Sequence, residues 1–415
     1  MSEKNTNRWL VALGGVLMQL CLGTVYGWSV FTLPLMQAHG WTRSQVTLTF
    51  TIAIAFLGIA AVTGGYILDK KGARNVAITG GILFGIGMLG TGYGNNVGSL
   101  TLIYLCYGLL GGLGVGFGYI TPIATLVKWF PDKRGVITGI AVMGFGFGAL
   151  IISICAPLMI SSIGISNTFY VFGLIFLAGI VGGAWVLVEP PAGWAPAGWT
   201  PKVGGSSQVV GMTLNEAAGT KYFYLLWAML FFNITAGIAI ISQASPMAQE
   251  LMGAGMSAVD KAKQAGVILG IFALVNGLGR LLWASLSDKI GRRTVFMLLF
   301  STQAMAFFLL SGLNNLVLFT VLVSYIYACY GGGFATMPAY AADIFGTKYV
   351  GRIYGWIITA WSAAGIVGPM LFAKLREVTG NYSSALLYTA IVLAVVLILP
   401  MLATPQKTKL KEVEV

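Results

Sequence analysis

Arg280 lies deep inside an apolar stretch of the chain, VNGLGRLLW at 275–283. A guanidinium at the centre of a membrane-spanning helix costs about 2.5–3.5 kcal/mol, so a chain rarely keeps one there without a function. Arginine stays ionised, and its planar fork of donors matches a carboxylate. An arginine in this position therefore predicts a binding site for a small organic anion.

Asn276 precedes Arg280 by four residues, so a helix would place both side chains on one face. None of the 12 acidic residues falls at the same depth, and Glu250 and Glu377 approach only the outer ends of their apolar stretches. With no acid of the chain to pair with, Arg280 is expected to anchor a carboxylate from solution. An internal ion pair that joins two helices is the alternative.

The composition identifies the class of protein that must position these residues. Of the 415 residues, 57% are hydrophobic and 9% are charged, whereas a soluble domain carries about 25% charged residues. Only a polytopic protein of the lipid bilayer fits. The net charge of +12 comes from lysines and arginines in short loops, which is typical of topogenic signals and excludes a nucleic-acid-binding face.

A membrane-spanning helix needs about 20 mostly apolar residues. Twelve such stretches lie at 8–36, 44–68, 75–94, 98–128, 135–162, 167–188, 221–250, 263–287, 294–312, 315–340, 349–373 and 382–403. With the N-terminus inside, most of the 24 lysines and arginines fall on the inner side, and the outer side receives only Arg43, Lys261, Lys263, Lys374 and Arg376. The positive-inside rule therefore predicts a multi-pass protein with both termini in the cytoplasm.

The longest loop begins at Glu189, contains PAGW twice and divides the helices six and six. Such a segment forms no core and is typical of a linker. We therefore expect an N-terminal six-helix bundle over 1–188, a cytoplasmic linker over 189–220 and a C-terminal six-helix bundle over 221–415. Within the linker, 212–222 is expected to form a short interfacial helix.

An internal repeat supports this division. GYILDKKGAR at 65–74 follows the second apolar stretch, and ASLSDKIGRR at 284–293 follows the eighth. Duplicated six-helix units are typical of a secondary transporter whose site lies between its halves. The glycine clusters at 111–118 and 139–148 lie inside apolar stretches and are expected to be packing seams, not phosphate loops.

The chain offers no sign of an enzyme. Its four cysteines lie in apolar stretches without CxxC spacing, and His39 is its one histidine. This set cannot build a zinc or haem site, so no metal or cofactor is expected. No nucleophile–base pair of an enzyme can be assembled either.

The repeated loop matches the signature G-x-x-x-D-(R/K)-x-G-x-(R/K), and the chain resembles the major facilitator superfamily across essentially its whole length. The second copy carries Ala284 in place of the first glycine. The resemblance implies an all-α membrane protein with twelve transmembrane helices in two six-helix bundles. It also implies gating motifs at Asp69, Arg74, Asp288 and Arg292, with the aspartates engaging a helix end or an arginine.

Other segments resemble the monocarboxylate and oxalate/formate transporters of this superfamily, most of all the bacterial lactate-type monocarboxylate transporters. They are YGW at 26–28, KWFPDKRG at 128–135, PPAGW at 190–194 and DIFG at 343–346. The resemblance implies a location in the bacterial cytoplasmic (inner) membrane. It places Arg280 on the carboxylate-binding arginine of this group and Tyr119, Tyr330 and Phe334 on aromatic residues of its substrate chamber.

Two positions depart from these relatives. Oxalate/formate exchangers carry a buried lysine on the eleventh helix, where alignment on YGW at 354–356 places Trp361. Losing a second cation favours a monoanion over a dicarboxylate. Animal monocarboxylate transporters carry an aspartate where this chain has Asn276, which cannot titrate. The group that handles a coupled proton is therefore left open.

The leading hypothesis is a secondary transporter of small monocarboxylates such as lactate or pyruvate, working by alternating access and functional as a monomer. Arg280 would pair with the anion, and Asn276 and the tyrosines would take its remaining polar atoms. Trp28, Phe334 and Trp361 would form apolar walls, with plain core packing as the alternative for each aromatic. H+ symport and carboxylate/carboxylate exchange of the oxalate–formate type both stay open.

Overall fold

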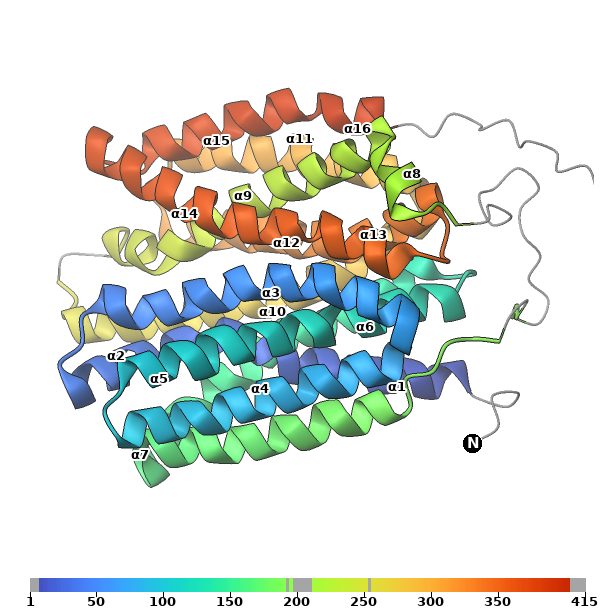
Figure 1. Cartoon of the computed structure of the whole chain (residues 1–415). Coiled ribbons are helices and arrows are strands. Elements are labelled where there is room, and N and C mark those ends of the chain that lie inside the picture. The colour runs from blue at the N-terminus through green and yellow to red at the C-terminus, as the bar shows by residue number, and fades with distance from the viewer. Residues whose placement is uncertain (1–6, 192–193, 197–210, 253–254, 404–415) are drawn as a thin grey trace, which may run out of the picture.

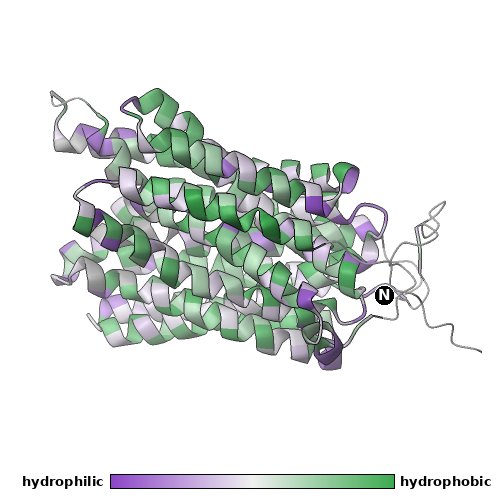
Figure 2. Cartoon of the chain, turned by 90° about the horizontal axis from the view of Figure 1, so that it is seen from above, coloured by the Kyte–Doolittle hydropathy of each residue, from purple (hydrophilic) through white to green (hydrophobic). Residues whose placement is uncertain are grey.

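The computed structural model is a bundle of long helices that run side by side (Figure 1). It describes residues 7–191, 194–196, 211–252 and 255–403. Hydrophobic residues cover the middle of the helices, and hydrophilic residues gather towards the two ends of the bundle (Figure 2). Large apolar side chains exposed on the helices, such as Leu158 and Leu282, suit a lipid environment and would be costly in water.

The helices are α1 (Arg8–Gly23), a 3₁₀ turn η2 (Thr24–Trp28), α2 (Ser29–His39), α3 (Arg43–Lys71), α4 (Ala73–Asn96), α5 (Leu100–Ile103), a π segment η3 (Tyr104–Gly111), α6 (Gly112–Trp129), α7 (Arg134–Trp185), α8 (Leu214–Ala218), α9 (Lys221–Glu250), α10 (Ala258–Ile290), α11 (Arg292–Ser311), α12 (Leu316–Phe345), α13 (Val350–Ile357), α14 (Thr359–Thr379), α15 (Ser383–Val396) and α16 (Ile398–Leu402).

Within the described residues, eleven helical segments are long and apolar enough to cross a membrane. The longest, α7, spans 52 residues and contains a non-helical Gly164 at φ 80° and ψ 168°. A left-handed φ of this kind is open to glycine and costly for other residues. Gly164 therefore divides α7 into two crossings, which agrees with the predicted break between 162 and 167. The all-helical fold with twelve crossings is confirmed.

Several crossings are less regular than the sequence suggests. The first contains the 3₁₀ turn η2, the fourth contains the π segment η3, and the eleventh is interrupted at Ile358 between α13 and α14. Short 3₁₀ and π segments inside helices often mark functional positions. Two of these three irregularities, η2 and the break at Ile358, adjoin the site described below.

The predicted short helix after the linker is present as α8. Thr213 begins it with a capping box, in which its side chain accepts from the Glu216 N–H while the Glu216 carboxylate accepts from the Thr213 N–H. These bonds lower the pKa of Glu216. Next to α8, the Met212 N–H donates to the carbonyl of Phe345 at 2.8 Å, so this part of the linker is tied to the end of α12. The domain boundaries themselves stay predictions.

Glycines bring the helices into close contact. In α6, a Cβ on Gly114 would lie 2.5 Å from the backbone nitrogen of Phe84 in α4. In α7, a Cβ on Gly146 would lie 3.0 Å from the Cα of Gly277 in α10. Both glycines come from the clusters predicted to be packing seams. The second contact joins residues from opposite sides of the linker.

We expect Gly114→Val to lower the free energy of unfolding by about 1–3 kcal/mol, because the added carbons would meet the backbone of α4. Thermal unfolding of the purified protein in detergent measures this. Gly182→Val is the matched control, since nothing lies within 4 Å of a Cβ at that helical glycine. Equal melting temperatures for the two variants would contradict the prediction.

Candidate functional site

Arg280 on α10 is 1% exposed and is only partly hydrogen-bonded. Its Nε donates to Oδ1 of Asn276 at 3.2 Å, and its Nη1 donates to the backbone carbonyl of Val142 on α7 at 3.4 Å. Its Nη2 has no partner in the described chain. The structure forms no ion pair to Arg280 among the described residues. One N–H-bearing edge of a buried guanidinium therefore lacks an acceptor among the described residues.

Asn276 is held so that its oxygen faces Arg280. Its Nδ2 donates to the backbone carbonyl of Tyr327 on α12 at 2.7 Å. That bond assigns the amide orientation, because the nitrogen can donate and the oxygen cannot. The predicted shared face of Asn276 and Arg280 is confirmed as a direct contact.

Aromatic rings from both sides of the linker enclose the guanidinium. The Arg280 Cζ lies 5.9 Å from the ring centre of Phe145 on α7 and 5.5 Å from that of Phe334 on α12. Trp361 on α14 packs against Phe334 at 4.9 Å and against Tyr119 on α6 at 5.6 Å between ring centres. Such rings shield the charge from lipid and stabilise a cation through their faces.

Four buried donors in this cluster have no hydrogen-bond partner in the part of the chain that the structure describes: Nη2 of Arg280, the hydroxyls of Tyr119 and Tyr354, and Nε1 of Trp361. The hydroxyls of Tyr119 and Tyr354 are neighbours, so one of them can donate to the other and leave a single hydroxyl proton free for a ligand. An unsatisfied buried donor costs about 1–3 kcal/mol. Arg280 Nη2, Trp361 Nε1 and one tyrosine hydroxyl together therefore indicate a place for a ligand rich in acceptors.

The structure brings most of the predicted site residues together. Asn276, Arg280, Tyr119, Phe334 and Trp361 form the cluster described above. Tyr330 joins it through its ring contact with Phe334 at 5.2 Å.

Trp28 lies elsewhere, which corrects its expected place as a wall of the site. Its Nε1 donates to the Val46 carbonyl at 3.1 Å, and its ring packs on Tyr107 at 4.3 Å. The physical reason is spacing, because residues two apart point to opposite sides of a helix. Tyr26, two residues earlier, faces Trp361 at 5.6 Å instead.

Three members of the cluster were not predicted from the sequence: Tyr26, Phe145 and Tyr354. Tyr26 and Tyr354 are each the first residue of a YGW triplet. The triplets supported the family resemblance and the alignment but were not assigned to the site. Phe145 lies in a glycine cluster assigned to packing. The repetition of YGW on the first and eleventh crossings was a usable signal. No sequence pattern pointed to Phe145.

The end of the bundle where α1 begins and α12 ends, here called the basic end, is closed by charged contacts. Asp69 on α3 pairs with Arg352 on α13 at 2.9 Å. The Asp288 carboxylate accepts from the N–H groups of Gly135 and Val136 at 2.9 and 2.8 Å, so it caps the start of α7. A carboxylate is favoured there by the helix dipole and its free N–H groups.

Asp343 completes this closure by joining two arginines. It accepts from Arg134 at the start of α7 at 2.7 Å and from Arg292 at the start of α11 at 2.9 Å. Arg292 also pairs with Asp288 at 2.6 Å. Arg74, the remaining gating-motif residue, lies away from these contacts and over the ring of Trp185 at 5.9 Å.

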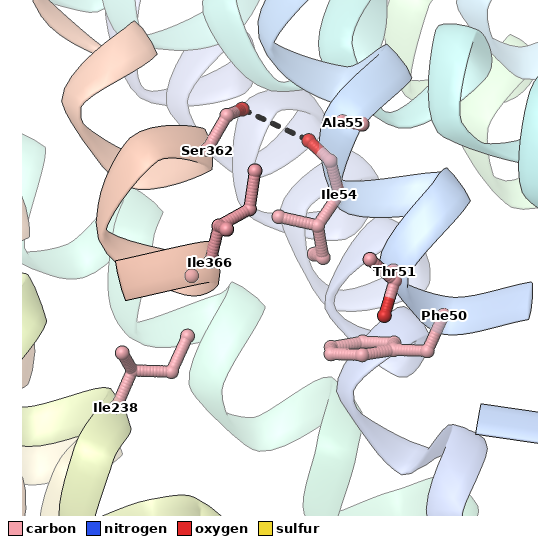
Figure 3. Close-up of a pocket in the computed structure, with 8 residues that line it drawn as sticks. Phe50, Thr51, Ile54, Ala55, Ile238, Ser362 and Ile366 are labelled. Atoms are coloured by element: carbon pink, nitrogen blue, oxygen red, sulfur yellow. Dashed lines mark hydrogen bonds between the residues drawn. The ribbon is translucent and has the colours of Figure 1, made fainter. Parts of the chain in front are cut away.

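Away from the basic end, hydroxyl groups join helices from the two sides of the linker. The hydroxyls of Tyr26 and Tyr330 share a hydrogen bond of 3.1 Å. The Ser362 hydroxyl on α14 donates to the Ile54 carbonyl on α3 at 2.9 Å, beside a cavity of about 30 Å³ (Figure 3). Phe50, Ile238 and Ile366 also line this cavity. It connects elements from both sides of the linker.

Comparison with known proteins now decides the family. The model of the Major Facilitator Superfamily matches residues 15–262 and 260–414, nearly the whole chain. The chain belongs to the Major Facilitator Superfamily. It is therefore a multi-pass membrane protein of a transporter family.

This superfamily member has curated relatives along its whole length. It is 29% identical to the oxalate:formate antiporter of Oxalobacter formigenes, over 93% of this chain and 88% of that protein. It is 25% identical to apicoplast pyruvate carrier 1 of Toxoplasma gondii, over 98% and 92%. Among solved structures, the superfamily transporter FucP in the outward conformation has the same fold, with a TM-score of 0.71 at 17% identity over 95% of this chain and 99% of FucP.

We expect Asp343→Asn to open the basic end of this superfamily member, because it leaves Arg134 and Arg292 without the carboxylate that joins them. Lys133 and Lys348 are exposed and can be replaced by cysteines that carry nitroxide labels. Pulsed electron–electron double resonance should then show a new population at a longer distance between the two labels.

Asp132→Asn is the matched control for that experiment. Asp132 pairs with Arg8 at 2.7 Å between α1 and the start of α7, so its loss removes the same charge without cutting the contacts of Asp343. An unchanged distance distribution in Asp343→Asn, or the same shift in both variants, would contradict the assignment.

Proposed function

We propose that this Major Facilitator Superfamily member transports small monocarboxylates of the lactate or pyruvate type, with the carboxylate bound at Arg280. The observation that carries the proposal is a buried, permanent cation whose Nη2 has no partner in the described chain, with the donors of Tyr119, Tyr354 and Trp361 beside it. A carboxylate offers acceptor sites on both oxygens and matches the guanidinium fork. A bound carboxylate would accept from these donors, whose burial without a partner costs free energy.

The size and charge of the site favour a monoanion with a short apolar tail. Arg280 is the single cation in the described cluster, and Trp361 stands where a second cation is expected in oxalate/formate exchangers. The rings of Phe145, Phe334 and Trp361 would enclose a methyl-bearing tail. Relatives named for oxalate and formate and for pyruvate support a carboxylate as the substrate class.

Transport would proceed by alternating access between two six-helix bundles, 1–188 and 221–415, joined by the linker at 189–220. The charged contacts of the basic end would close one side, and Tyr26, Tyr330 and Ser362 would close the other. Closure around a neutralised ion pair costs less than closure around a bare charge. This makes movement of the loaded carrier easier than movement of the empty one.

We place the basic end in the cytoplasm of a bacterium and the bundle in its inner membrane. Lysines and arginines gather at this end, in loops and in the last turns of helices, among them Lys70, Lys133, Lys289 and Lys348. The positive-inside rule supports this orientation. A fluorescent-protein fusion at the C-terminus is expected to fluoresce, and a periplasmic alkaline-phosphatase fusion there to be inactive.

We expect Arg280→Lys to lower kcat/KM for labelled lactate roughly 10- to 100-fold in proteoliposomes, because an ammonium loses the bidentate, charge-assisted hydrogen bonds of the guanidinium. The control is Arg376→Lys, a half-exposed arginine that pairs with Glu250 on the surface. Wild-type transport by Arg280→Lys would refute the proposed anchor. Equal losses in both variants would show only a general effect of the substitution.

H+ symport is the proposed coupling, and carboxylate exchange is the alternative that the antiporter relative favours. An acidic exterior should then drive concentrative lactate uptake into empty proteoliposomes, with pyruvate competing and oxalate competing poorly. Uptake that ignores the pH gradient but requires a carboxylate inside would favour exchange. Strong competition by oxalate would contradict the monocarboxylate preference.

A further inference from the structure

Two buried amide side chains make the same contact on opposite sides of the linker. Nε2 of Gln19 on α1 donates to the backbone carbonyl of Tyr119 on α6 at 3.1 Å. Nδ2 of Asn233 on α9 donates to the backbone carbonyl of Tyr330 on α12 at 3.3 Å. Both amides are 0% exposed. In each case the acceptor belongs to a tyrosine of the candidate site.

The two contacts occupy equivalent places in the duplicated fold. Gln19 and Asn233 lie on the first and seventh crossings, and the tyrosines lie on the fourth and tenth. The donor and acceptor residues are 100 apart in one pair and 97 apart in the other. The repetition links this contact to the pair of site tyrosines and not to one local turn.

Neither helix needs this bond for its own stability. A carbonyl inside an α-helix already accepts from the N–H four residues later, and the side-chain amide uses its second lone pair. An apolar side chain of similar size would fill the space without burying an amide, which costs free energy unless its groups are paired. The bond instead fixes where each tyrosine backbone lies relative to a neighbouring helix.

The second contact is held more firmly than the first. Oδ1 of Asn233 accepts from Nε2 of Gln303 on α11 at 3.0 Å, which assigns the orientation of the amide. Gly333 leaves the room for it, since a Cβ there would lie 2.1 Å from Nδ2 of Asn233. In the first contact, Oε1 of Gln19 has no partner in the described chain. The Tyr119 side of the site is therefore the more adjustable one.

We infer that Gln19 and Asn233 are positioning residues for substrate binding. Each sets the backbone of its tyrosine so that the hydroxyl of Tyr119 or Tyr330 can reach a carboxylate at Arg280. This inference rests on the proposed function. The two amides touch the tyrosine carbonyls and act on the ligand only through the tyrosines.

The test is a pair of double-mutant cycles on lactate transport by the full chain in proteoliposomes. Gln19→Leu is expected to raise KM roughly 3- to 10-fold, the worth of one neutral hydrogen bond, with little change in kcat. In the Tyr119→Phe background, which keeps the ring and lacks the hydroxyl, Gln19→Leu should change KM no further. Asn233→Leu and Tyr330→Phe should behave in the same way.

The crossed pairs are the controls. Gln19→Leu with Tyr330→Phe should give the product of the two single effects, because Gln19 holds Tyr119 and does not contact Tyr330. Melting temperatures in detergent should stay close to wild type, since leucine fills the space of the amide. If Gln19→Leu does not fold, Gln303→Leu is the alternative variant. It removes the hydrogen bond that orients Asn233 without changing a tyrosine. It should raise KM only when the Tyr330 hydroxyl is present.

Three outcomes would overturn the positioning role: an unchanged KM in Gln19→Leu and Asn233→Leu, the same rise in KM with and without the tyrosine hydroxyl, or no effect of the Tyr→Phe variants themselves. Failure of the proposed function would show differently. Arg280→Lys would then transport lactate normally, whereas a defective Arg280→Lys with silent amide variants overturns the positioning role alone.

Discussion

The structure depends on one costly feature, a permanently charged guanidinium in the apolar interior of a membrane protein. Arg280 is nearly inaccessible and meets one side-chain oxygen and one backbone carbonyl, and no ion pair forms to it among the described residues. A charge left in this state opposes burial unless a ligand neutralises it. The aromatic cluster, the unpaired donors and the contacts that close the bundle all surround this buried charge.

The two closures differ in kind. At the basic end, three carboxylates bridge helices from both sides of the linker, and one of them caps a helix. Away from that end, the hydroxyls of Tyr26, Tyr330 and Ser362 make hydrogen bonds between helices from both sides of the linker, and Ser362 also lines a small cavity. Ion pairs near a surface weaken with salt and hydration, while hydroxyl bonds respond little to either. The balance between the two sides therefore depends on ionic strength at one end only.

The sequence predicts the fold well because its signals are long. Apolar stretches of some 20 residues, a proline-rich linker and a duplicated charged loop leave few alternatives, and even the break at Gly164 falls within the predicted gap. The site is predicted less completely. Arg280 and Asn276 follow from helical spacing. Tyr26 takes the place in the site that was expected of Trp28, because a sequence does not show which way a helix faces where a 3₁₀ turn interrupts it. Phe145 belongs to the site through tertiary packing alone.

The contact between Arg280 and the carbonyl of Val142 has a consequence for how this transporter can diverge. Across the interface Arg280 uses a backbone atom, so substitution at position 142 keeps the hydrogen bond that holds the guanidinium. The walls around it are side chains carried by other helices: Phe145, Phe334 and Trp361. Selection for charge and selection for tail length are thereby separated. Under the proposed function, descendants of this protein can change the acid that they carry through the walls and keep Arg280 unchanged.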